Sequence, residues 1–309
     1  MVKYFIHDRG AAWRGGGNAT QNFLGRWADP WARPQVPPAC RPMFSKDNDV
    51  IRLAANLTMM FTELPFLERL DAAAAAGFKA VECVAPYVEP AEVVADRLKS
   101  LGLTMALFNM PPGDWAAGDR GIGANPARRA EFKDSIATAI EYARATGCKT
   151  LHLMAGKIAL DADRDEWRGT LVMNIREAAD AALGEGIILV LEPINSRVDI
   201  PGYFYDTTAA VLSVMDIVAR PNVKLLYDIY HMQIMEGDLA RTMERIMPRI
   251  GHVQLADNPG RNEPGTGEIN YPWLLSRLDA LGYQGWVGCE YKPAGATASG
   301  LGWAKPYLA

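Results

Sequence analysis

From residue 51 onward, short apolar runs alternate with longer segments that have a helical spacing of apolar positions. In residues 126–145, Phe132, Ile136 and Ala143 recur every three to four positions or a multiple of that spacing, so they form one apolar stripe. The short runs are almost wholly apolar, which is typical of parallel strands that are covered on both faces. We therefore predict eight strands, at about 51–57, 79–84, 103–109, 149–154, 187–192, 223–228, 251–256 and 286–290.

Glycine and capping residues mark the ends of the helical segments. Glycine stands at the joint between a helical segment and the next apolar run, as in KSLGLTMALF and RATGCKTLHL. A helix often ends on a residue with left-handed backbone, which glycine adopts without steric cost. Asn125-Pro126 and Asn270-Tyr271-Pro272 place a capping side chain before a first turn, followed by proline where no amide bond is lost.

Eight strands that alternate with helices predict an α/β fold, a closed (β/α)8 TIM barrel. The alternative is an open, doubly wound sheet. No GxGxxG or GxxxxGK[ST] motif follows the first strand, which disfavours that alternative. The chain has 309 residues, and a barrel of this type requires about 250 in one piece.

Residues 1–50 differ from the rest of the chain. They contain a Gly-Gly-Gly run and a proline-rich stretch, and they show neither strand nor helix periodicity. They do not resemble a secretory signal, because no apolar centre of about 7–15 residues follows the charges. We predict an N-terminal extension that is either irregular or included by a misassigned start, with Met43 as the true start. Residues 51–309 are predicted to form a single catalytic barrel domain.

Polar residues stand at the ends of the predicted strands, where the active sites of such barrels lie. Glu192, Asp228, Gln254 and Glu290 end four consecutive strands. Because consecutive strands are neighbours, we expect these four side chains to converge above the barrel. A single carboxylate at a strand end is as often an ion-pair partner or a loop anchor, but four such polar residues on consecutive strands predict a site. The earlier strands end on Asn56, Glu82, Asn109 and His152.

Three carboxylates and one amide in one place would repel one another unless a cation were present. All four residues offer oxygen, with neither thiolate nor imidazole among them. Such a set suits a hard divalent ion, Mg²⁺ or Mn²⁺, better than zinc or copper. We therefore predict a divalent metal held by Glu192, Asp228, Gln254 and Glu290.

Composition excludes several other classes of function. The net charge is −4 and no run of Lys or Arg stands out, so we expect no nucleic-acid partner. No apolar stretch approaches the roughly 20 residues of a membrane span, so we expect no membrane partner. The four cysteines are widely spaced without a CxxC pair, which indicates reduced thiols in a cytoplasmic protein. A homo-oligomer is compatible with the sequence, but no interface stripe predicts one.

Six segments, in order from residue 51 to the C-terminus, resemble the hydroxypyruvate isomerase family of xylose-isomerase-like barrels. They are AANLTMMFTE, FNMPPGDWAAGDRG, LEPINSR, YDIYHMQ, HVQLADNPGRNEPGTGEI and GCEYKP. The resemblance implies that Glu192 and Glu290 are the proton donor and acceptor and surround the metal with Asp228 and Gln254. It also implies that His231 contacts substrate oxygens.

One position departs from the pattern of related sugar epimerases, which usually have histidine where this chain has Gln254. An amide binds most metals less tightly than imidazole, so we expect this chain to hold a metal less tightly than those epimerases do. His252 lies two residues earlier on the same strand. By strand alternation it faces the same side at a deeper level, and we interpret it as a packed core histidine rather than a ligand.

The resemblance implies interconversion of hydroxypyruvate and tartronate semialdehyde by proton transfer through an enediolate. The substrate, a 2-oxo or hydroxy acid, carries a carboxylate that should meet a cation. Arg261 is the first candidate because its planar fork matches a carboxylate, and Lys157 is the second. The alternatives are a 2-oxo-tetronate isomerase, a neutral-sugar isomerase or epimerase, and a sugar-acid binding protein without activity.

Overall fold

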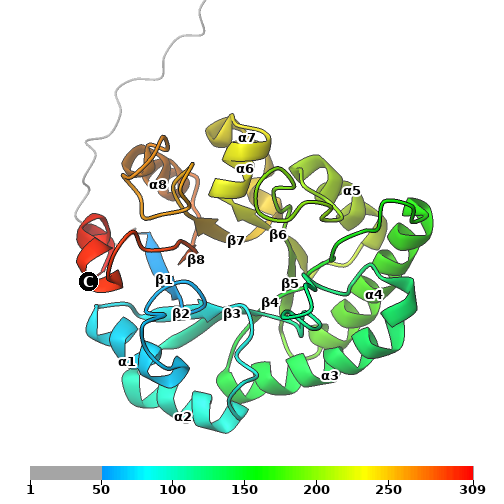
Figure 1. Ribbon diagram of the computed structural model, residues 1–309, viewed down its shortest axis with the longest axis horizontal. Helices are drawn as coiled ribbons and strands as arrows, with labels where there is room; N and C mark the ends of the chain where they lie inside the picture. Colours follow the sequence, from blue (N-terminus) through cyan, green and yellow to red (C-terminus); the bar gives the residue numbers. More distant parts are fainter. Residues whose placement is uncertain (1–50, 309) are drawn as a thin grey trace, which may run out of the picture. The chain divides into compact units, whose positions relative to one another are not determined.

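The computed structural model describes residues 51–308, and the predictions made for residues 1–50 lie outside them. The chain forms a closed barrel of eight parallel strands in which each strand pairs with the next and β8 pairs with β1 (Figure 1). The predicted fold and all eight predicted strands are confirmed. The strands are β1 (Arg52–Asn56), β2 (Ala80–Cys83), β3 (Thr104–Asn109), β4 (Thr150–His152), β5 (Ile188–Leu191), β6 (Val223–Asp228), β7 (Ile250–Leu255) and β8 (Trp286–Cys289).

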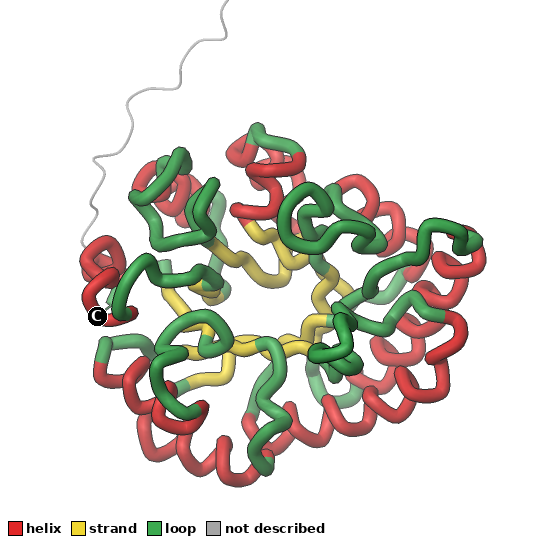
Figure 2. The backbone as a smooth tube through the Cα atoms, viewed as in Figure 1, coloured by secondary structure: helices red, strands yellow, loops and turns green. Residues whose placement is uncertain are grey.

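The helices form a ring outside the strands (Figure 2). Most of the buried apolar side chains lie in one continuous core that includes residues of both strands and helices. The α-helices are α1 (Phe66–Ala75), α2 (Ala91–Leu101), α3 (Arg129–Thr146), α4 (Arg164–Leu183), α5 (Thr208–Val218), α6 (Ile229–Met235), α7 (Leu239–Ile246) and α8 (Tyr271–Ala280). Short 3-10 helices are η1 (Pro126–Arg128), η2 (Met247–Arg249) and η3 (Thr297–Tyr307).

The capping signals of the sequence operate as predicted. The Asn125 side chain accepts a hydrogen bond from the backbone N–H of Ala127 at 3.0 Å. Gly102 and Gly147 end α2 and α3 with φ values of 64° and 73°, in the left-handed region that glycine tolerates. Helix α5 departs from this rule, because its left-handed end residue is Ala219.

Two connections differ from one helix per strand. Between β6 and β7 the chain forms two helices, α6 and α7, separated at Gly237 and Asp238, which both have positive φ. After β8 the chain forms the 3-10 helix η3 instead of an α-helix. Helix α6 starts directly at the end of β6 because Asp228 caps it, accepting the backbone N–H groups of Tyr230 and His231. The end of strand β6 is therefore also the beginning of a helix.

None of the helices in residues 51–308 is both long enough and apolar enough to cross a membrane. Cys83, Cys148 and Cys289 are buried, unpaired thiols.

Gly288 on β8 leaves room for a side chain that crosses the barrel interior. A Cβ at this position would lie 2.3 Å from both carboxylate oxygens of Glu82, which belongs to β2 and is fully buried. Oε1 accepts hydrogen bonds from Asn56 and Gln254, and Oε2 lies 2.7 Å from His252 Nε2, so the carboxylate has little freedom to move aside. Packing inside the barrel therefore requires glycine at position 288.

We expect Gly288→Ala to lower the free energy of unfolding by about 1–3 kcal/mol, because the added methyl overpacks a filled core. Urea unfolding checks this. Gly169→Ala is the matched control, since Gly169 lies on the exposed side of α4 with no atom within 4 Å of the added Cβ. Alanine there should stabilise the protein by up to about 1 kcal/mol. Equal effects of the two substitutions would contradict this account.

Candidate active site

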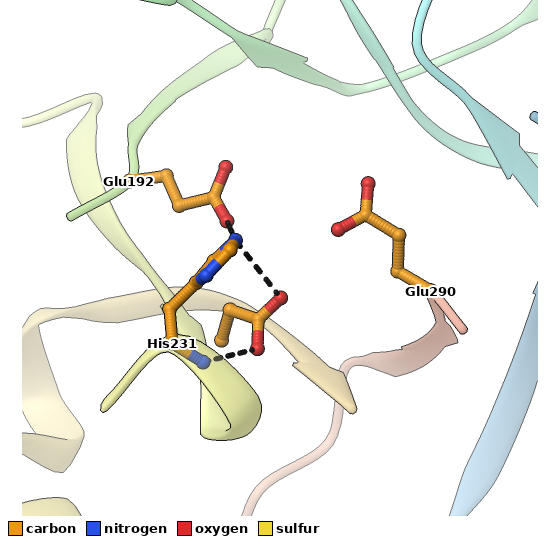
Figure 3. Close-up of side chains that lie close together, drawn as sticks. Glu192, His231 and Glu290 are labelled. Carbon is orange, nitrogen blue, oxygen red and sulfur yellow. Dashed lines mark hydrogen bonds and ion pairs between the residues drawn. The ribbon is translucent and has the colours of Figure 1, made fainter. Parts of the chain in front are cut away.

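Four ionisable side chains meet at the carboxyl end of the barrel. Glu192 directly follows β5, Asp228 ends β6, His231 lies in the first turn of α6, and Glu290 directly follows β8. One ligand atom from each lies within 4.8 Å of the others, and all four residues are buried. Figure 3 shows Glu192 and Glu290 on opposite sides of the cluster, with His231 beside Glu192. The structure thus brings together three of the four predicted metal ligands and the predicted substrate-binding histidine.

His231 is held in one tautomer by Asn195. The Oδ1 atom of Asn195 accepts the backbone N–H groups of Val198 and Asp199, so its Nδ2 faces His231 Nδ1 at 2.7 Å. An amide nitrogen only donates, so Nδ1 is an acceptor and the ring proton resides on Nε2. This Nε2 lies 3.5 Å from Glu192 Oε1. Burial, then the nearby Arg261, hold the pKa of His231 well below its usual range, so the ring is a neutral donor directed at the cluster.

Arg261 reaches the cluster from the loop after β7. Its guanidinium lies 2.7 Å from Glu290 Oε2 and 3.1 Å from Asp199 Oδ1, and the side chain is only 12% exposed. Burial alone would lower the pKa of Arg261, but Glu290, Asp228 and the other carboxylates raise it, so the cation persists. The structure therefore places the first predicted carboxylate-binding residue inside the site.

Asp257 fixes the loop that carries Arg261. This buried carboxylate accepts the backbone N–H groups of Gly265 (2.8 Å), Gly267 (3.0 Å) and Ile269 (3.1 Å). Lys157, the second predicted cation, is exposed in the loop after β4, where its backbone bridges to Tyr203. The geometry distinguishes the two candidates, since Arg261 is held against the cluster and Lys157 faces solvent.

Gln254, the fourth predicted ligand, is paired in register with Asp228 and donates its amide Nε2 to Glu82 Oε1 at 2.7 Å. Its Oε1 atom is buried without a hydrogen-bond partner in residues 51–308. The same is true of Glu192 Oε1 and Asp228 Oδ2. A buried oxygen without a donor is costly, and a hard cation would satisfy all three. The residues present therefore fit a divalent metal.

His152, at the end of β4, also belongs to the site. Its Nδ1 lies 3.6 Å from Glu192 Oε2, and its Nε2 is buried without a hydrogen-bond partner in the described part of the chain. Burial, then the nearby His252, lower the pKa of His152 to about 3, so the ring is neutral. The sequence placed His152 at the polar end of the fourth strand, but nothing in its spacing from the other residues indicated a role.

Burial raises the pKa values of the three clustered carboxyl groups. The pKa of Glu192 lies well above its usual range because of burial and then the charges of Glu290 and Asp228. Burial raises the pKa of Asp228 to about 6 and that of Glu290 to about 8, although Arg261 opposes both shifts. Without a bound cation the cluster holds protons near neutral pH, as a pair of groups that exchange protons with a substrate requires.

The chain belongs to the family of xylose isomerase-like TIM barrels, whose model matches residues 70–307. Its similar proteins include isomerases. It is 49% identical to the 2-oxo-tetronate isomerase of Cupriavidus necator, over 83% of this chain and 98% of that protein. It is 47% identical to the hydroxypyruvate isomerase of Escherichia coli, over 84% of this chain and 100% of that protein.

Solved structures agree on the fold. A Brucella melitensis protein described as an AP endonuclease of family 2 is 49% identical, with a TM-score of 0.82 over 84% of this chain and all of that one. The 3-keto-D-glucoside 4-epimerase of E. coli has a TM-score of 0.68 over 83% of this chain and 99% of that one, and at 21% identity it shows the fold alone.

The raised pKa values predict how the stability of the metal-free protein depends on pH. Glu290 keeps its proton in the folded state up to about pH 8, whereas its ordinary pKa is 4.5. Its contribution to stability therefore falls as pH rises between these values. His152 and His231 have lowered pKa values, so their opposite effect ends near pH 6.5. Between pH 6.5 and 8 the carboxyl groups dominate.

After treatment with a chelator, the wild-type free energy of unfolding should fall from pH 6.5 to 8 more steeply than that of Glu290→Gln, which cannot lose a proton there. Urea titrations at several pH values measure both profiles. Parallel profiles would show that Glu290 does not titrate with a raised pKa in the folded protein.

Proposed function

We propose that this protein interconverts hydroxypyruvate and tartronate semialdehyde by proton transfer between adjacent carbons. The observation that carries the proposal is the placement of two buried carboxyl groups, Glu192 and Glu290, on opposite sides of one cluster. Two relatives that match this chain over nearly their whole length are named as isomerases of this kind. The substrate class is a small 2-oxo or hydroxy acid.

The reaction requires a base, an acid and a donor for the negative oxygen. Glu192, as the carboxylate, takes a proton from C3 of hydroxypyruvate, and the electrons of the broken C–H bond form the enediolate. The neutral His231 donates its Nε2 proton as a hydrogen bond to the oxygen where negative charge develops. Glu290, in its protonated form, delivers a proton to C2. The proton of the C3 hydroxyl passes to the C2 oxygen, so that C3 becomes the aldehyde and C2 carries a hydroxyl.

Glu192, Asp228, Gln254 and Glu290 would hold the divalent ion, for which we propose Mg²⁺ or Mn²⁺. When bound, the ion would act as a Lewis acid that polarises the carbonyl and the adjacent hydroxyl of the substrate. Three buried oxygens without hydrogen-bond partners support this assignment.

Arg261 binds the substrate carboxylate in this proposal. Its guanidinium already contacts two carboxylates, Glu290 and Asp199, so a third can approach the same donors. The exchange of a Glu290 contact for the substrate would also free Glu290 for its role as acid. Lys157 could contribute only from the solvent side.

A four-carbon 2-oxo acid is the second candidate substrate, because relatives named for each activity match with almost equal identity. A neutral sugar has no carboxylate that could pair with Arg261, so it is less suited to this site. A binding protein without activity would not require both Glu192 and Glu290.

Deuterium exchange tests the proposed proton transfer. In D2O the wild-type protein should introduce deuterium at C3 of hydroxypyruvate, detected by proton NMR, and Glu192→Gln should lose this exchange by at least about a hundredfold. Glu185→Gln, at an exposed ion pair with Arg144, is the control and should exchange normally. Slower exchange in EDTA that Mg²⁺ restores would support the metal.

Exchange with a four-carbon 2-oxo acid alone would keep the chemistry and change the substrate. An absence of exchange with every 2-oxo acid and sugar tested would reject the proposed function.

Substrate kinetics distinguish the roles of the two cations, Arg261 and Lys157. Arg261→Ala should raise KM for hydroxypyruvate by about 10- to 100-fold, because a hydrogen bond to a charged group is lost, and should change KM for a neutral hydroxyketone much less. Lys157→Ala should leave both KM values near wild type. Steady-state kinetics with the two substrates measures the difference. Equal shifts for the acidic and the neutral substrate would argue against a role of Arg261 in carboxylate binding.

A further inference from the structure

Glu82 is a buried carboxylate that the proposed reaction does not use. It lies on β2 and is fully buried. Three polar side chains converge on it. Gln254 Nε2 lies 2.7 Å from Oε1, His252 Nε2 lies 2.7 Å from Oε2, and Asn56 Nδ2 lies 2.9 Å from Oε1. Oε1 of Glu82 therefore accepts hydrogen bonds from the side-chain amides of both Asn56 and Gln254.

The contact with Gln254 resolves an ambiguity that every amide ligand has. An amide side chain has two edges of nearly the same shape, and only the oxygen can bind a cation. Oε1 of Glu82 already accepts a hydrogen bond from Asn56, so it selects the orientation in which Gln254 Nε2 donates to it and Gln254 Oε1 points away. That Oε1 is buried without a hydrogen-bond partner in residues 51–308, like Oδ2 of the neighbouring Asp228.

Asn56 extends the same control to Glu290. The Oδ1 atom of Asn56 accepts the backbone N–H of Thr58 at 3.0 Å, so its Nδ2 must face the two carboxylates. It lies 2.9 Å from Glu82 and 3.4 Å from Glu290. Glu82 therefore contacts Gln254 directly and is linked to Glu290 through the side-chain amide of Asn56.

We propose that Glu82 is a positioning residue that turns the carbonyl oxygen of Gln254 toward the divalent-ion position. The inference rests on the proposed function for the presence of the ion. It also accounts for the amide ligand, since an amide at this position requires a hydrogen-bond acceptor behind it to present its oxygen to the ion. Gly288 contributes by leaving the space that the Glu82 carboxylate occupies.

The test is Glu82→Gln, which preserves size but introduces a donor. The introduced amide can donate to Gln254 Oε1, so Gln254 can turn over and present nitrogen to the ion. We expect the Kd for Mn²⁺ to rise by about 10- to 100-fold, as is usual when a partner of a metal ligand is lost. Isothermal titration calorimetry with the full chain, stripped of metal by a chelator, measures this Kd independently of activity.

Two further variants separate orientation from loss of charge. In the exchanged pair Glu82→Gln/Gln254→Glu, the new carboxylate accepts from the new amide and still offers an oxygen, so Mn²⁺ should bind about tenfold or more tighter than to Glu82→Gln. In a Gln254→Met background no amide remains to be oriented. Adding Glu82→Gln there should leave the Kd almost unchanged, as a double-mutant cycle requires.

Asn222→Ala is the control for general destabilisation. Asn222 precedes β6, at the barrel end opposite the cluster, and its buried Nδ2 donates to the backbone oxygens of Ala179 and Ile187. This variant should melt at a lower temperature but bind Mn²⁺ like the wild type. A loss of Mn²⁺ affinity in Asn222→Ala as large as that in Glu82→Gln would overturn the proposal.

The proposal is also overturned if Glu82→Gln binds Mn²⁺ like the wild type, or if its loss persists in both the exchanged pair and the Gln254→Met background. If Glu82→Gln does not fold, the exchanged pair decides alone, since it should bind Mn²⁺ and any other result rejects the idea. A wild type that binds no Mn²⁺ but still exchanges deuterium would reject this inference and keep the isomerase. If Mn²⁺ binds to all variants as expected but the wild type exchanges no deuterium, the role of Glu82 stands and the isomerase activity is rejected.

Discussion

The burial of several carboxylates in one barrel is the constraint on which the rest of this structure depends. Glu82, Glu192, Asp228 and Glu290 are all at least nine-tenths buried, and a buried charge is tolerated only when it is paired, hydrogen-bonded or neutralised by a proton. The four carboxylates meet this requirement in different ways. Glu82 accepts hydrogen bonds from two amides, Asp228 caps a helix, Glu290 contacts Arg261, and burial raises the pKa of Glu192.

The closed barrel makes this concentration of charge possible. The four strand-end residues Glu192, Asp228, Gln254 and Glu290 stand 36, 26 and 36 residues apart, yet parallel pairing of neighbouring strands brings them to one rim. Their backbones are held by strand hydrogen bonds, so the side chains cannot separate to relieve repulsion. The scaffold therefore supplies the energy that keeps the carboxyl groups poised to bind a cation or to exchange a proton.

The sequence predicted the features that depend on local pattern. Strand positions follow from apolar runs, and the convergence of Glu192, Asp228 and Glu290 follows from their place at strand ends. It also placed His252 correctly as an interior residue on the side of Gln254. Contacts across the barrel could not be predicted in this way, because no spacing relates β2 to β7.

The interaction of Glu82 with Gln254 was therefore invisible, and Glu82 and Asn56 remained without a role. The Asp199 contact of Arg261 joins two loops, whose conformations depend on caps such as Asp257 rather than on periodicity. Helix α6 could not be separated from β6 for a related reason. Asp228 starts a helix with no intervening loop, so the usual boundary between strand and helix is missing from the sequence.

Asp228 divides its two oxygens between architecture and chemistry. Oδ1 begins helix α6, and Oδ2 faces His231 at 3.8 Å within the cluster. Folding of this connection and assembly of the reactive centre are thus one event. In a chain where α6 has not formed, His231 is not placed in the site and the Asp228 carboxylate is not oriented. Selection acting on the site would therefore also act on the stability of α6, and neither could drift without the other.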